Sequence, residues 1–114
     1  MSNEAKNPGE VTLCVSNGYK KKFYLNENFN QLPQSIRDEL KIMCVLYTED
    51  VGGILELVFD EDGTLQFKTS CEENDFLYDE IGSVLKIKQY QNEKRDLLEA
   101  LEMFYRIIYL GEGL

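Results

Sequence analysis

Stretches in which apolar and polar residues alternate, each closed by a turn sequence, constrain the fold of this chain more than any other feature. The first stretch is Val11–Val15, and the Asn17-Gly18 pair that follows it is a strong signal for a hairpin. Lys20–Leu25 then returns as a second strand, and its three consecutive lysines are typical of a protected sheet edge. The sequence therefore predicts a β-hairpin between residues 11 and 25.

A second hairpin is predicted further along the chain. Ile54–Phe59 alternates, residues 60–63 (Asp-Glu-Asp-Gly) form a turn, and Thr64–Ser70 is the answering strand. The turn also resembles the start of a calcium-binding loop, but Cys71 stands near the twelfth position, where such a loop needs an acidic residue. We therefore expect a hairpin turn and no metal site here.

Helical spacing of apolar residues follows the first hairpin. Pro33 stands at a plausible first helical position, and an apolar stripe over residues 36–47 predicts an amphipathic helix. The stripe consists of Ile36, Leu40, Met43, Cys44 and Tyr47. Ile42, Val45 and Leu46 fall outside it, so residues 42–47 could instead form a strand. We favour a helix that ends at Gly52-Gly53, because no turn residue interrupts the segment.

A second region of helical spacing extends over residues 76–110, as one long helix or as two helices joined near Asn92. Asn74 or Asp75 is suited to cap its start, and Gly111 ends it. In such a helix, Asp75 and Asp79 would be neighbours on one side at a solvated helix start. We expect no metal to bind there.

The two predicted units of hairpin and helix can be aligned with an offset of 45 residues. The aligned pairs are Leu32 with Leu77, Ile36 with Ile81, Leu40 with Leu85, and Ile42 with Ile87. The strand arms do not align in phase, so a ββα duplication followed by a C-terminal helix stays one alternative. The predicted fold class is α+β, an antiparallel sheet of two hairpins with helices packed on one face. We expect a single domain over residues 11–114 after a flexible tail, residues 1–10.

The net charge of −9 is concentrated in one segment of the chain. Residues 49–80 contain eleven acidic residues and one lysine, a balance of −10, and the other residues balance to +1. This segment would repel nucleic acid, and it is either a solvated face or a docking surface for a basic protein partner. The chain has no apolar run near the ~20 residues that a membrane span needs, and its start lacks a signal peptide. We expect a cytoplasmic protein that binds no membrane.

Chemically reactive groups are scarce. The sequence has no histidine, which removes histidine-based acid–base chemistry and the commonest metal ligand. Cys14 and Cys44 lie in apolar runs and are expected to be buried structural residues, and Cys71 stands beside two glutamates that blunt its reactivity. No phosphate-loop or serine-nucleophile motif occurs. We therefore predict no catalytic, cofactor-binding or metal-binding residues and expect a protein that is not an enzyme.

The C-terminal run from Met103 to Leu110 is the most suggestive functional feature, since seven of its eight residues are apolar or aromatic. A surface helix buries one apolar stripe, so such a run needs cover on a second side. That cover is either the rest of the domain or a second chain. The candidate interface residues of a homodimer are Met103, Phe104, Ile107, Ile108 and Leu110.

Several short strings carry a resemblance to a known family. They are residues 38–44 (Asp-Glu-Leu-Lys-Ile-Met-Cys), 51–54 (Val-Gly-Gly-Ile), 79–83 (Asp-Glu-Ile-Gly-Ser) and 86–88 (Lys-Ile-Lys). With them, the chain resembles an uncharacterised bacterial family of short acidic proteins over most of residues 11–111. The family is a domain of unknown function, so the resemblance implies a stand-alone cytoplasmic domain and no site residues. The layout is also loosely similar to small secretion-chaperone-like α+β dimers.

Two hypotheses of function follow. The first is a non-enzymatic interaction domain, adaptor-like or chaperone-like, that acts as a homodimer through its terminal helix or its acidic segment. The alternative is a small-ligand-binding protein or enzyme with a pocket between helices and sheet. The candidate lining residues of that pocket are Tyr19, Tyr47, Tyr78 and Arg106.

Overall fold

The computed structural model describes residues 9–111. The elements follow in the order β1 (Val11–Asn17), β2 (Lys22–Leu25), the short 3-10 helix η2 (Glu27–Phe29), α1 (Gln34–Val51), β3 (Ile54–Phe59), β4 (Leu65–Ser70), α2 (Glu80–Glu93) and α3 (Arg95–Ile108). Most of the predicted tail, residues 1–8, lies outside the described residues. Glu10, the last residue of that tail, forms an ion pair of 2.7 Å with Lys68 on β4.

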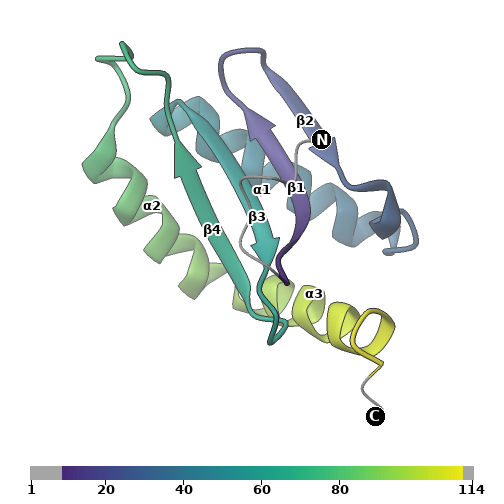
Figure 1. Cartoon of the computed structure of the whole chain (residues 1–114). Helices are drawn as coiled ribbons and strands as arrows, with labels where there is room; N and C mark the ends of the chain where they lie inside the picture. Colours follow the sequence, from purple (N-terminus) through teal and green to yellow (C-terminus); the bar gives the residue numbers. More distant parts are fainter. Residues whose placement is uncertain (1–8, 112–114) are drawn as a thin grey trace.

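The four strands form one antiparallel sheet in the order β2-β1-β3-β4 (Figure 1). The two predicted hairpins therefore lie side by side, with their first strands paired at the centre and with β2 at an edge. A register shift between Thr12 and Cys14 inserts Leu13 as an extra residue in β1. Such a bulge changes the direction of neighbouring side chains, and both Leu13 and Cys14 are buried.

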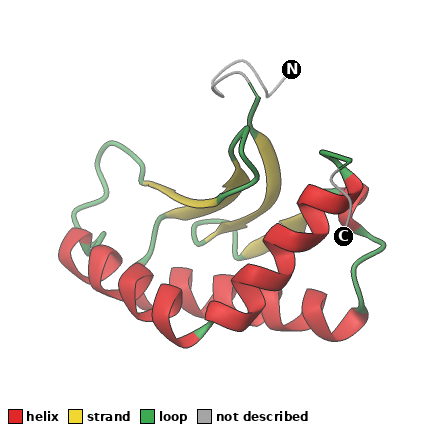
Figure 2. Cartoon of the chain, turned by 90° about the horizontal axis from the view of Figure 1, so that it is seen from below, coloured by secondary structure: helices red, strands yellow, loops and turns green. Residues whose placement is uncertain are grey.

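All three α-helices lie in one layer on the same face of the sheet (Figure 2). The predicted α+β class, with helices packed on one face, is therefore confirmed. The core between the layers includes Leu55 and Leu57 of β3 and a group of aromatic rings. Phe59 and Tyr105 stack with their centroids 4.2 Å apart, which attaches the apolar run of α3 to the sheet.

Helix α1 spans residues 42–47, so the favoured helical interpretation is confirmed. Its predicted stripe is buried at Leu40, Met43, Cys44 and Tyr47. The helix ends at a pair of glycines, as expected. Gly53 has a φ of +70°, and a Cβ there would lie 2.6 Å from the carbonyl oxygen of Ser70, so only glycine fits.

The start of the first hairpin's second strand was predicted two residues too early. The side chain of Asn17 accepts hydrogen bonds from the backbone N–H groups of Tyr19 (3.0 Å) and Lys20 (3.1 Å). These bonds hold residues 18–21 as a loop, so β2 begins at Lys22. Pro33 similarly precedes the first helical residue of α1 as its N-cap.

The predicted helix start at Asn74 or Asp75 is wrong. Asp75 accepts hydrogen bonds from the backbone N–H of Leu77 (2.9 Å) and from the hydroxyl of Tyr19 (2.5 Å), which hold this segment as a loop. Helix α2 begins at Glu80, and Asp79 caps it by accepting from the N–H of Gly82 at 2.8 Å. Asp75 and Asp79 are therefore not neighbours on a helix. Residues 76–110 contain two helices, which meet at Lys94.

Candidate functional site

A cavity of about 520 Å³ lies between α1 and the loop of the first hairpin. Its volume is within the range of small-molecule sites. The hairpin loop is fixed over the end of α1 because the N–H of Gly18 donates to the carbonyl of Gly53 at 2.8 Å. The lining residues are Ser16, Asn17, Gly18, Lys21, Lys22, Phe23, Lys41, Val45, Thr48 and Glu49.

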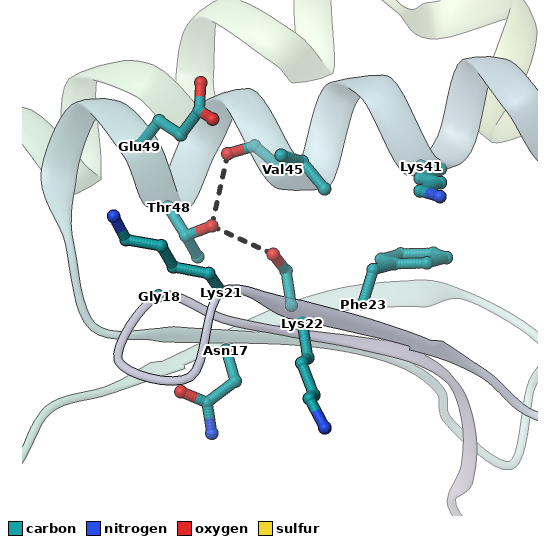
Figure 3. A pocket seen from close by; sticks show the side chains of 10 residues that line it. Asn17, Gly18, Lys21, Lys22, Phe23, Lys41, Val45, Thr48 and Glu49 are labelled. Atoms are coloured by element: carbon teal, nitrogen blue, oxygen red, sulfur yellow. Dashed lines mark hydrogen bonds between the residues drawn. The ribbon is translucent and has the colours of Figure 1, made fainter.

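A pair of buried hydroxyl groups forms one wall of this cavity. Ser16 and Thr48 are almost fully buried, and their oxygens lie 2.9 Å apart in a hydrogen bond between β1 and α1 (Figure 3). The hydroxyl of Thr48 also donates to the carbonyl of Val45, at 3.2 Å. Since each hydroxyl has one proton, both protons are used within the protein, from Ser16 to Thr48 and from Thr48 to Val45, and the pair connects β1 to α1.

Lys21 has an unusual backbone conformation. Its φ of +54° is left-handed, and it is the one residue other than glycine with positive φ among residues 9–111. This conformation costs roughly 1–2 kcal/mol for a residue with a Cβ. Figure 3 shows the consequence, because the Lys21 side chain rises from the loop toward Thr48 while Lys22 points away from α1.

The electrostatic character of the cavity is cationic, since Lys21 and Lys41 stand against one glutamate, Glu49, while the charged end of Lys22 points away from α1. The ion pairs formed among the described residues are Lys68–Glu10 and Lys86–Asp50, and neither involves a lysine of the cavity. Lys41 projects from α1 above the ring of Phe23 (Figure 3). The arrangement therefore offers positive charge that has no ion-pair partner within residues 9–111, beside an aromatic surface, in a chain whose net charge is −9.

A second feature is an apolar surface at the start of α2. We define the α2 surface as Phe76, Leu77, Ile81, Val84 and Leu85, which are between 54% and 93% exposed. Helix α2 buries Ser83 and Tyr90 on its opposite side, against α1. Ile42 and Leu46 on α1 are also exposed.

The predicted interface residues of α3 fall into two groups. Met103, Ile108 and Leu110 are exposed, and Phe104 and Ile107 are partly buried. Phe104 packs near Phe29, with the ring centroids 6.2 Å apart. Part of the cover that this run needs is therefore supplied within the chain, and the interface stays a prediction.

The tyrosines and the arginine proposed for a pocket do not line this cavity. Tyr47 and Tyr78 instead meet at Ser83, where the hydroxyl of Tyr78 donates to the Ser83 oxygen at 3.1 Å and Tyr47 forms a second hydrogen bond. Burial raises the pKa of Tyr47 above its usual range. The hydroxyl of Tyr19 donates a hydrogen bond to Asp75, and Arg106 lies against the turn at Gly63. The predicted pocket between helix and sheet exists, but these residues do not form it.

Both cysteines predicted to be buried are buried, and the fold brings them together. The Sγ atoms of Cys14 and Cys44 lie 3.9 Å apart between β1 and α1. Burial raises the pKa of the Cys14 thiol well above its usual value, which keeps it protonated. The spacing of these residues in the sequence gave no sign of this contact.

The acidic turn after β3 is a hairpin turn, as predicted. One oxygen of the Asp60 carboxylate accepts from the backbone N–H groups of Asp62 and Thr64, each at 2.9 Å. The other oxygen accepts from the side chain of Gln66 at 3.1 Å. These hydrogen bonds lower the pKa of Asp60, so the ionised carboxylate stabilises the turn.

The fold and these surfaces define a small α+β domain that has a cationic cavity and an apolar helical surface. Among residues 9–111, no helix combines the length and apolar character needed to cross a bilayer. The chain belongs to the family of unknown function (DUF6145), whose family model matches residues 10–113. The resemblance to an uncharacterised family is thereby confirmed. No curated protein and no solved structure matches the chain.

Proposed function

We propose that this protein is a non-enzymatic interaction domain that acts as a homodimer, and that its two copies associate through the α2 surface. The observation that carries the proposal is the exposure of five large apolar side chains, from Phe76 to Leu85, around one helix start. Monomeric proteins rarely expose contiguous apolar patches larger than a few hundred Å². An apolar surface of this kind is typical of a protein–protein contact.

The size of the apolar area supports a second copy as the occupant. A fully exposed large apolar side chain contributes roughly 100 Å², as judged from its burial free energy. The α2 surface together with Ile42 and Leu46 thus exposes on the order of 450 Å² of apolar side chain. One side of a standard interface buries ~800 Å², of which a little over half is apolar, also ~450 Å².

Ile42 and Leu46 lie beside α2 because of how the two helices pack. Asp50 of α1 forms an ion pair of 3.0 Å with Lys86 of α2. Leu46 is one helical turn before Asp50, and Ile42 is one turn earlier still, so both follow the same side of α1. Ile42 and Leu46 therefore lie on the side of α1 that carries Asp50, next to its contact with α2.

Charge complementarity also supports self-association. Glu80, Val84 and Lys88 are spaced by four residues and share one side of α2. If two copies of α2 pack antiparallel across a twofold axis at Val84, Glu80 of each copy lies opposite Lys88 of the other. A twofold interface is self-complementary in this way.

A basic protein partner is the less favoured occupant. Several acidic side chains of residues 49–80 already bond within the chain, as Asp50 does with Lys86, Asp60 with its turn and Asp75 with Tyr19. The apolar surface, in contrast, has no partner among the described residues. We therefore place the interface on α2 and not on the acidic segment.

The test compares two exposed apolar residues on different helices. We expect sedimentation equilibrium to show a dimer at tens of micromolar. Ile81→Glu should raise the dimer dissociation constant at least ~100-fold, because each copy would bury an unpaired charge. Met103→Glu introduces the same charge on α3 and should leave the dimer intact. A monomer at all concentrations contradicts the homodimer. Dissociation by Met103→Glu alone would place the interface on α3.

A charge-swap experiment tests the antiparallel arrangement. Glu80→Lys and Lys88→Glu should each weaken the dimer by creating like-charge contacts, and the double variant should restore it. Restoration distinguishes a direct contact from a general effect of net charge. If the double variant is as weak as the single ones, the two α2 helices do not pack in this register.

A further inference from the structure

The cavity between α1 and the first hairpin has features of a ligand site that the proposed homodimer does not use. Its lining residues come from β1, the hairpin loop, β2 and α1, and none of them belongs to the α2 surface. We propose that this cavity binds a small organic anion, a carboxylate or phosphate attached to an aromatic or aliphatic body.

The positive charge is the first argument. Lys21 and Lys41 approach the cavity from the loop and from α1, respectively, and neither forms an ion pair with another described residue (Figure 3). Lysine is a flexible point charge that commonly binds phosphate and carboxylate groups. Lys21 supplies the direct ion pair, and Lys41 adds a second positive charge on the opposite wall.

The shape and the apolar lining define the rest of the ligand. The ring of Phe23 and the side chain of Val45 face the cavity from the sheet and from the helix. An aromatic ring accommodates the flat or aliphatic part of a ligand. A volume of about 520 Å³ accepts such a molecule in addition to its charged group.

The backbone of Lys21 is an independent observation. A left-handed residue in a hairpin loop is most stable as glycine or asparagine, yet a lysine stands here with φ +54°. Strained residues of this kind cluster at active sites and ligand-binding loops. In this loop, the Lys21 side chain extends from the hairpin toward the end of α1 that carries Thr48 and Glu49 (Figure 3).

The experiment titrates the full-length protein with phenyl phosphate and monitors binding by the NMR chemical shifts of the backbone amides. We expect saturable binding with shifts concentrated at Phe23, Val45 and Thr48. Benzyl alcohol has the ring without the charge, and inorganic phosphate has the charge without the ring, so both should bind at least tenfold more weakly. Equal binding of benzyl alcohol, equal binding of inorganic phosphate, or no binding of phenyl phosphate at millimolar concentration would each overturn the proposal.

A matched pair of variants locates the charge. Lys21→Gln should lower the affinity for phenyl phosphate about 10- to 100-fold, the usual effect of losing a charged hydrogen bond. Lys20→Gln removes the same charge from the adjacent residue, which does not line the cavity, and should change the affinity less than twofold. The spectra report directly whether each variant is folded. Equal losses in both variants would show a general electrostatic effect and would overturn the assignment to Lys21.

Lys21→Gly separates the role of the side chain from the conformation of the loop. Glycine accepts the left-handed backbone without strain, so the loop is retained. We expect this variant to be no less thermally stable than the wild type. Its affinity for phenyl phosphate should nevertheless fall to the same extent as that of Lys21→Gln. Retained affinity in Lys21→Gly would overturn the role of the lysine.

Discussion

Helices α1 and α2 each follow a β-hairpin, and they have related apolar spacing, but they bury very different surfaces. Leu40 of α1 is 0% exposed, whereas Leu85 of α2, which aligns with it at an offset of 45 residues, is 62% exposed. Leu32 and Leu77, which precede the two helices, differ in the same way, at 3% and 93%. Helix α1 packs directly on the sheet, with α2 and α3 beside it in the same layer, so its stripe has cover. Helix α2 packs on α1 through its other side. Periodicity therefore predicts an apolar face but does not say what covers it.

The sharpest test of this difference replaces the aligned leucines. Leu40→Ala leaves a cavity in the core and should lower the unfolding free energy by about 2–5 kcal/mol. Leu85→Ala should change it by less than about 0.5 kcal/mol in the monomer, because the side chain is exposed there. Urea denaturation followed by circular dichroism, at the lowest practical protein concentration, measures both. A loss at Leu85 as large as that at Leu40 would mean that α2 is covered within one chain.

Much of the fold could be predicted from local patterns. Strand alternation and turn residues determine both hairpins, since each pairs neighbouring segments through a short loop. The strongest local signals, at Asn17 and at Asp60, are turn residues whose side chains bond the adjacent backbone. The start of α2 was missed because Asp75, Asp79 and their neighbours are all able to cap a helix. Contacts with residues distant in sequence decide between them, such as that of Asp75 with Tyr19 and that of the Asp79 N–H with the carbonyl of Val51.

The candidate sites could be predicted much less well. The cavity depends on contacts between residues far apart in sequence, such as Ser16 with Thr48 and Gly18 with Gly53. The three lysines at residues 20–22 were interpreted as protection of an edge strand, and β2 is indeed at an edge. Their roles nevertheless differ, because the left-handed conformation of Lys21 turns it toward the cavity. No periodic pattern carries that information.

The polar contact between α1 and α2 provides a second test of the comparison. Tyr47 is fully buried, and its hydroxyl bonds Ser83 of α2. Ser83→Ala leaves the hydroxyls of Tyr47 and Tyr78 without this partner and should cost about 1–3 kcal/mol. Tyr47→Phe removes the buried hydroxyl itself and should cost about 1 kcal/mol. Urea denaturation measures both, and a larger loss in Tyr47→Phe would show that Ser83 is not the bridging group.

The same tyrosine gives a prediction for alkaline pH. Burial raises the pKa of Tyr47 above its ordinary value of 10.0, so the folded state retains the neutral phenol. Its contribution to stability is therefore complete below pH 10 and is lost as the pH rises toward the folded pKa. Between pH 9 and 11, the unfolding free energy of Tyr47→Phe should decrease less than that of the wild type. Parallel decreases would show that Tyr47 ionises equally in both states.

The smallest effect is expected from the charged contact at the same seam. The hydrogen bond to Asp50 raises the pKa of Lys86, so this contribution is complete below the ordinary lysine pKa of 10.5 and is lost as the pH rises through the higher pKa of the folded state. Both side chains are partly exposed, and exposed ion pairs contribute little and are screened by salt. Asp50→Asn should therefore lower stability less than Ser83→Ala, and the difference from wild type should shrink in 1 M NaCl. A salt-independent loss as large as that of Ser83→Ala would mean that Asp50 contributes through a hydrogen bond that salt does not screen, and that this bond holds α2 to α1 as strongly as the buried Tyr47–Ser83 contact does.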